Sequence, residues 1–80
     1  MARFYFHLDE CGSLLIDPEG RDLPCADTAR AHAVREARHV ISFDAIDGRL
    51  RLDCAIVVED HRRREVLRMP FREAVAVISG

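Results

Sequence analysis

The segment that decides the fold is residues 26–44, which read ADTARAHAVREARHVISFD. Apolar residues at helical spacing in this segment are Ala26, Ala29, Ala33, Val34, Ala37, Val40 and Ile41. They recur every three or four residues, as on a helix with one apolar face, while Arg, His and Glu fill the other side. For three turns the apolar face is mostly alanine, which lets a helix approach a sheet closely while larger side chains of the sheet fill the interface. We therefore expect one long helix packed on one face of a sheet.

The residues before this helix predict a β-hairpin. Residues 3–9 alternate between apolar and polar, which is the period of a half-buried strand. The apolar side consists of Phe4, Phe6 and Leu8. Residues 9–12 have turn composition, residues 13–17 return as a second strand, and the Asp-Pro-Glu-Gly stretch at 17–20 ends that strand.

The residues after the helix predict a second hairpin and a short closing helix. Residues 49–59 alternate over the longest stretch in the chain, residues 60–64 form a charged turn, and residues 65–69 return as a fourth strand that Pro70 ends. Apolar residues then recur at helical spacing. They are Phe71, Ala74, Val75 and Ile78.

Together these elements predict an α+β fold in the order ββαββα. We expect a four-stranded antiparallel or mixed sheet, with the long helix packed on one face and a short helix at the C-terminal end. A chain of 80 residues forms one domain, residues 1–80. So short a chain buries only about 60–65% of its unfolded surface. Its thin core favours a homodimer, because a partner's surface can complete it.

Charge and cysteine content limit the classes of function. The net charge is −2, from 12 basic and 14 acidic residues, whereas dedicated nucleic-acid and membrane-surface binders carry a strong basic excess. Three cysteines without close pairs predict free thiols in a reducing cytoplasm. No apolar run approaches the ~20 residues of a membrane span, and the first residues lack the apolar core of a signal peptide. The expectation is a cytoplasmic protein that does not contact membranes.

Side chains that could bind metal or catalyse a reaction lack the spacing that either function needs. The candidate metal ligands are His7, Cys11, His32, His39, Cys54 and His61. Structural zinc sites present close pairs such as C-x2-C, and no such pair occurs here. Cys54 fits better as a small core residue. The serines and cysteines lack a recognisable nucleophile context. We therefore expect no metal, no cofactor, no catalytic residue and no enzymatic activity.

A basic turn is the sharpest electrostatic feature. Arg62, Arg63 and Arg64 follow one another, and Arg49 and Arg51 are expected on a neighbouring strand. These five side chains are candidate contacts for nucleic-acid phosphates or for an acidic partner. The alternative is a solvated turn whose charges discourage association of sheet edges.

Three apolar residues are out of phase with the core side of their strands. They are Leu15, Ala55 and Val57. Either the closing helix covers them or another chain does, so they are candidate interface residues.

The whole chain resembles a small bacterial family of uncharacterised single-domain proteins. The resemblance implies the fold given above and brings no assigned catalytic residues. The matching stretches are Arg3–Leu8, Asp17–Gly20, Leu23-Pro24, Ala29–Ala31, Ala33, Ala37-Arg38 and Pro70–Val75.

The first half is also similar to the HicB-type antitoxin domain. In that domain hairpin strands precede a helix that begins with Asp-Thr, as Asp27-Thr28 does here after Leu23-Pro24. This similarity implies a small toxin as the protein partner.

The leading hypothesis is a non-enzymatic protein-interaction module that binds a second copy of itself or another protein. One alternative is a small nucleic-acid-binding regulator that uses the turn Arg62–Arg64. Another is a HicB-like antitoxin.

Overall fold

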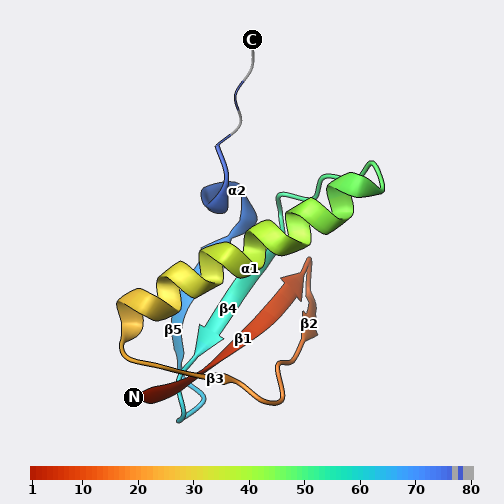
Figure 1. The fold of residues 1–80 in the computed structure, drawn as a ribbon. Coiled ribbons are helices and arrows are strands. Elements are labelled where there is room, and N and C mark those ends of the chain that lie inside the picture. The colour runs from red at the N-terminus through yellow and green to blue at the C-terminus, as the bar shows by residue number, and fades with distance from the viewer. Residues whose placement is uncertain (77, 79–80) are drawn as a thin grey trace.

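An antiparallel sheet forms one layer of the molecule, and a long helix crosses one of its faces (Figure 1). The computed structural model describes residues 1–76 and residue 78. The elements are β1 (Ala2–Glu10), β2 (Ser13–Leu15), β3 (Arg21–Leu23), α1 (Ala26–Ile46), β4 (Ala55–Glu59), β5 (Glu65–Pro70) and α2 (Phe71–Ala74). The expected α+β class and ββαββα order, with the long helix on one face, are confirmed.

In the part of the chain that the structure describes, the sheet has five strands rather than the expected four. The strand order is β2-β1-β4-β5, and β3 also pairs with β1. β2 pairs with the last residues of β1 and β3 with its first residues, along the same edge (Figure 1). The fifth strand arises because the turn at residues 17–20 interrupts the pairing without ending it, so Arg21–Leu23 resume it beyond the turn.

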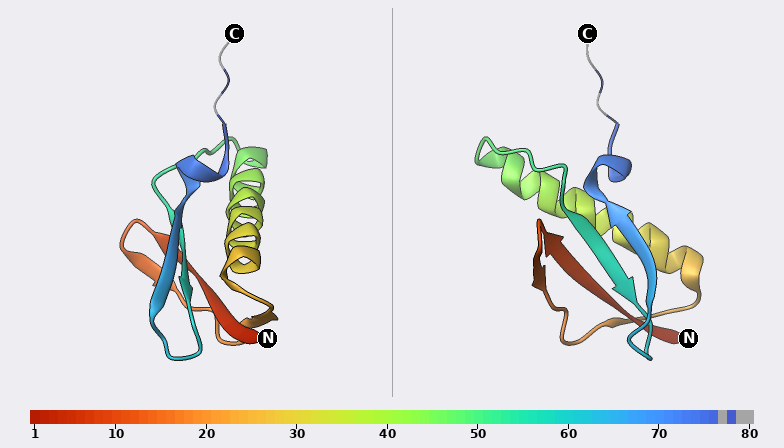
Figure 2. Two further views of the ribbon diagram at one scale, coloured as in Figure 1. Left: turned by 90° about the vertical axis from the view of Figure 1, so that its left-hand side faces the viewer. Right: turned by 180° about the vertical axis from the view of Figure 1, so that it is seen from behind.

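The alanine face of α1 lies against the sheet, as expected. Ala29, Ala33 and Ala37 are at most 1% exposed. The side view in Figure 2 shows the helix as a second layer beside the strands. α1 packs mainly on β4 and β5, where the larger core side chains lie. These include Ile56, Val58 and Met69, and Phe71 of α2 belongs to the same core.

The strand expected at residues 49–59 is shorter in the structure, because β4 begins only at Ala55. Ala55 pairs with Asp9, and β1 ends one residue later at Glu10. Residues 49–53 therefore lie beyond the end of β1, and no strand of the described residues lies beside them to pair with. These residues alternate as a strand does, but the sheet ends before it reaches them.

The closing helix is also shorter than expected. α2 spans only Phe71–Ala74, and Val75 already has extended backbone angles. Ile78 is 90% exposed and does not extend an apolar stripe, while residue 77 lies outside the described residues. Two hydrogen bonds hold α2 in place. The Phe71 N–H donates to the Cys54 carbonyl at 2.9 Å, and Arg38 Nε donates to the Ala74 carbonyl at 2.7 Å.

Among the described residues, neither helix combines the length and the apolarity that crossing a lipid bilayer requires.

The close contact between α1 and the sheet predicts the effect of a larger side chain. Ala33→Leu places three more carbons where the side chain is fully buried, so it should lower the free energy of unfolding by about 1–3 kcal/mol. Ala31 is exposed on the same helix, and Ala31→Leu should change that free energy by less than about 0.5 kcal/mol. Urea unfolding of both variants measures the difference. Equal effects at the two positions would contradict the close contact.

Candidate functional site

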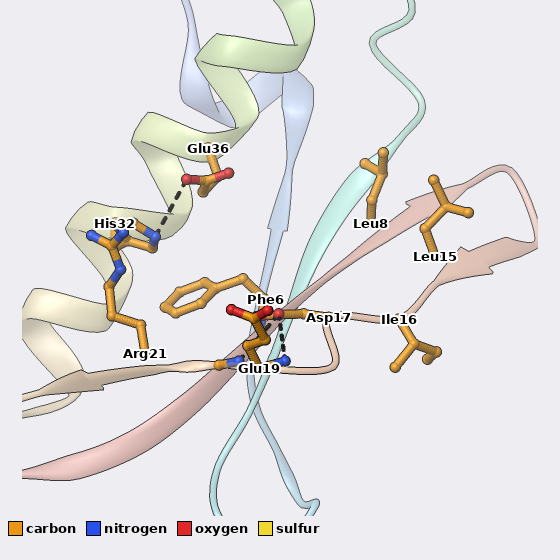
Figure 3. A pocket seen from close by; sticks show the side chains of 10 residues that line it. Phe6, Leu8, Leu15, Ile16, Asp17, Glu19, Arg21, His32 and Glu36 are labelled. Atoms are coloured by element: carbon orange, nitrogen blue, oxygen red, sulfur yellow. Dashed lines mark hydrogen bonds and ion pairs between the residues drawn. The ribbon is translucent and has the colours of Figure 1, made fainter.

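A groove lies between α1 and the edge of the sheet formed by β1 and β2. Its volume is about 390 Å³. Phe6, Leu8 and Leu15 belong to its sheet side, and His32 and Glu36 of α1 form the opposite wall (Figure 3). The loop between β2 and β3 supplies the remaining lining residues, which are Ile16, Asp17, Glu19 and Gly20, with Arg21 at the start of β3. The groove exists because α1 is centred over β4 and β5 and leaves the β1–β2 edge uncovered.

Asp17 holds the loop that lines one end of the groove. One carboxylate oxygen accepts the Phe6 N–H at 3.1 Å, in the gap between the residues of β1 that pair with β2 and those that pair with β3. The other oxygen accepts the N–H groups of Glu19 at 3.2 Å and Gly20 at 3.1 Å. Burial opposes ionisation of Asp17, but these three hydrogen bonds outweigh it and lower the pKa of the carboxyl.

Gly20 allows this loop to lie close to β1. Its φ is +71°, and a Cβ there would come within 2.8 Å of the Phe4 carbonyl oxygen and 2.9 Å of the Tyr5 ring. Any side chain would therefore clash with the backbone of β1, and the positive φ would add strain.

His7 supports the same loop from the outer face of the sheet. It is 1% exposed, and the Asp17 N–H donates to its Nδ1 at 3.0 Å. Nδ1 therefore carries no proton, and Nε2 donates to the Glu59 carboxylate at 2.9 Å. With both ring nitrogens engaged, His7 has a structural role. The sequence pattern placed His7 on the polar side of the strand and gave no sign of its burial.

His32 forms part of the helical wall. Its Nε2 lies 3.3 Å from a Glu36 carboxylate oxygen, one helical turn away. Its ring meets the Phe6 ring edge-on, with the centroids 4.5 Å apart. Burial lowers the pKa of His32, and the charge of Arg21 adds to that effect. The groove thus has an apolar floor and walls that carry both signs of charge.

Comparison with known families adds one finding. The sequence matches, over residues 3–72, the family described as a domain of unknown function (DUF6894). The chain belongs to this family. This membership confirms the resemblance to a small family without an assigned function. No curated protein and no solved structure matches the chain. The similarity of the first half to HicB-type antitoxins is therefore not supported.

In this DUF6894 chain the expected basic cluster is divided between the two ends of the sheet. Arg51 lies near the β1–β2 turn, where its guanidinium binds the carboxylates of Glu10 at 2.9 Å and Asp44 at 3.0 Å. It therefore joins residues 49–54 to β1 and to the end of α1. Arg49 is exposed in the same segment.

The turn Arg62–Arg64 lies at the opposite end of the sheet, between β4 and β5 (Figure 1). Asp60 accepts the backbone N–H groups of Arg62 at 2.8 Å and Arg64 at 3.1 Å. The Arg63 guanidinium stacks on the Tyr5 ring, 3.9 Å from its centroid. Arg51 and Arg63 thus have partners within the chain, and the five arginines do not form one surface.

The three candidate interface residues are also placed differently from one another. Leu15 pairs with Leu8, so it lies on the face that carries α1, and it is 55% exposed beside the groove. Ala55 and Val57 lie on the outer face but are buried within the chain. Val57 is flanked by His7 and Arg68 in register, and α2 packs against α1 rather than on this face. Of the three, Leu15 alone offers apolar surface.

The carboxylate of Asp17 predicts a pH-dependent contribution to stability. Asp17→Asn removes the charged acceptor of three N–H groups and should lower the free energy of unfolding by about 1–3 kcal/mol at pH 7. The folded-state pKa is lowered, so this stabilisation is complete above the ordinary aspartate value of about 3.9 and is lost as the pH falls through the folded-state value.

Urea unfolding between pH 7 and pH 3 tests this expectation. The difference in free energy of unfolding between wild type and Asp17→Asn should become smaller below about pH 4. Asp22→Asn is the matched control, because Asp22 is an exposed carboxylate that pairs with Arg3, and its effect should be small. If the difference in free energy of unfolding stays constant down to pH 3, the charge of Asp17 does not have this stabilising role.

Proposed function

We propose that this chain is a non-enzymatic protein-interaction module, and that it pairs with a second copy of itself through the groove between α1 and the β1–β2 edge. The observation that carries the proposal is the pair of apolar side chains left exposed at this groove. Leu15 is 55% exposed and Ile16 is 59% exposed, next to Phe6 and Leu8. Clustered exposed apolar surface is typical of interaction sites.

The flank of α1 that forms the helical wall carries one more exposed apolar side chain, farther along the helix. Phe43 follows His32 by eleven residues, about three turns of helix, and therefore lies on the same flank of α1. Its side chain is 75% exposed. Burying large side chains of this kind against a partner would contribute about 1.5–3 kcal/mol each. The small alanine face and the short chain leave little core within one copy, so such a contribution would be significant.

The charges around the groove favour a second copy as the partner. Arg21 and Glu19 both line the groove, and among the described residues neither side chain forms an ion pair. In a two-fold symmetric pair the same patch meets itself, so a basic group on one copy can face an acidic group on the other. A groove with both signs of charge is compatible with this arrangement.

Nucleic acid is a weaker candidate as the partner. Arg51 is neutralised by two carboxylates and Arg63 stacks on Tyr5, so the expected set of basic contacts is reduced and divided. The net charge of −2 also opposes binding to phosphates at physiological salt.

Sedimentation of a matched pair of variants tests the proposed dimer. Leu15→Lys puts one charge into each half of the symmetric interface, so it should weaken the dimer by about 100-fold or more. Leu14→Lys makes the same change on the neighbouring residue, which is 48% exposed but pairs with Asp9 on the opposite face. This control should leave the dimer unchanged.

Two results would overturn the proposal. One is a wild-type chain that sediments as a monomer at high micromolar concentration. The other is an equal effect of Leu14→Lys and Leu15→Lys, which would place any interface away from the groove.

A further inference from the structure

Two thiols and a carboxylate meet where the β1–β2 turn approaches the start of β4. They belong to Cys11, Asp53 and Cys54, and one potential ligand atom of each lies within 4.8 Å of the others. Cys11 Sγ donates to an Asp53 carboxylate oxygen at 3.0 Å. Asp9 pairs with Ala55, so the residues just beyond this pair on the two strands face each other at the end of the sheet. The cluster is separate from the groove.

Cysteine is an unusual choice at this turn. Cys11 and Gly12 are the two residues between β1 and β2, and both have positive φ, of 54° and 98°. Such two-residue turns favour Asn-Gly, because Asn tolerates positive φ better than most side chains. The turn therefore gains nothing locally from cysteine, whereas the thiol reaches Asp53 across the strand ends.

We propose that Cys11, Asp53 and Cys54 form a binding site for one zinc ion. Two thiolates and a carboxylate are ligand types that Zn²⁺ accepts, and three protein ligands leave a fourth position for water. A Zn–S distance of about 2.3 Å in tetrahedral geometry sets two sulfur ligands about 3.8 Å apart. Cys11 and Asp53 are exposed, so rotation of their side chains can bring the ligand atoms to these shorter distances. The buried Cys54 is the fixed ligand.

The protonation states define how zinc binding depends on pH. The hydrogen bond from Cys11 lowers the pKa of Asp53, so the carboxylate is already charged at neutral pH. The same hydrogen bond raises the pKa of Cys11 to about 11, and burial raises the pKa of Cys54. The other charged groups that act on the cluster are Glu10, Arg51 and Arg72. Binding must therefore displace two thiol protons, and the affinity should rise about 100-fold per pH unit near neutrality.

Titration of the reduced full-length chain with Co²⁺, followed by displacement with Zn²⁺, tests the site. We expect one Co²⁺ per chain, a near-ultraviolet thiolate-to-cobalt charge-transfer band, and loss of that band when Zn²⁺ is added. Cys11→Asn keeps a residue that tolerates the turn and should weaken binding at least tenfold. Cys25→Ser is the matched control, because it also removes one thiol but lies at the start of α1, where serine is a favoured N-cap.

Alkylation of the wild-type chain provides a second test that needs no variant. Cys11 and Cys25 are both exposed. Zn²⁺ should slow alkylation of Cys11 at least tenfold and leave the rate at Cys25 unchanged. The proposal fails if no charge-transfer band forms in excess Co²⁺, or if Cys11→Asn binds as tightly as wild type. It also fails if Zn²⁺ does not protect Cys11 from alkylation, or if Cys11 and Cys54 form a disulfide with each other and bind no metal.

Discussion

The contact between the alanine face of α1 and the sheet determines the rest of this architecture. Ala29, Ala33 and Ala37 are almost fully buried, so the helix axis lies close to the strands and large side chains of β4 and β5 fill the space between them. A helix held in that position cannot also cover the β1–β2 edge. The core and the uncovered groove therefore have the same origin, which is the choice of small side chains along one stripe of the helix.

The sequence pattern was sufficient for the elements that carry their own periodicity. The start of the helix at Ala26, the first hairpin and the order of the elements were all predictable, because alternation and helical spacing are local properties. Residues 49–54 alternate as a strand does, but whether they pair depends on where β1 ends, and no local pattern contains that information. The same limit explains why a stretch with turn composition at residues 17–20 did not end the pairing along β1.

The side chains that define the sites were harder to predict, because their partners are distant in sequence. His7 contacts Asp17 and Glu59, and the Cys11 thiol contacts Asp53. The spacing rules for metal ligands detect pairs on one turn or one helix, whereas this cluster forms across the ends of two strands. Arg51 and Arg63 show the same limit for charged side chains. A run of arginines indicates a basic surface, yet two of the five expected contacts are paired within the chain.

The carboxylate of Asp17 has a further consequence for the edge of the sheet that β2 and β3 form. An uninterrupted strand edge presents a row of free backbone groups to which a foreign strand can pair, and this is how ordered aggregates grow. Here the free edge consists of β2 and β3, which have three residues each, and Asp17 holds the loop between them to the Phe6 N–H of β1. An incoming chain that pairs along this edge therefore meets a break after a few residues. The edge beside the groove is thus protected against fibre growth, while the apolar side chains next to it remain accessible to a partner.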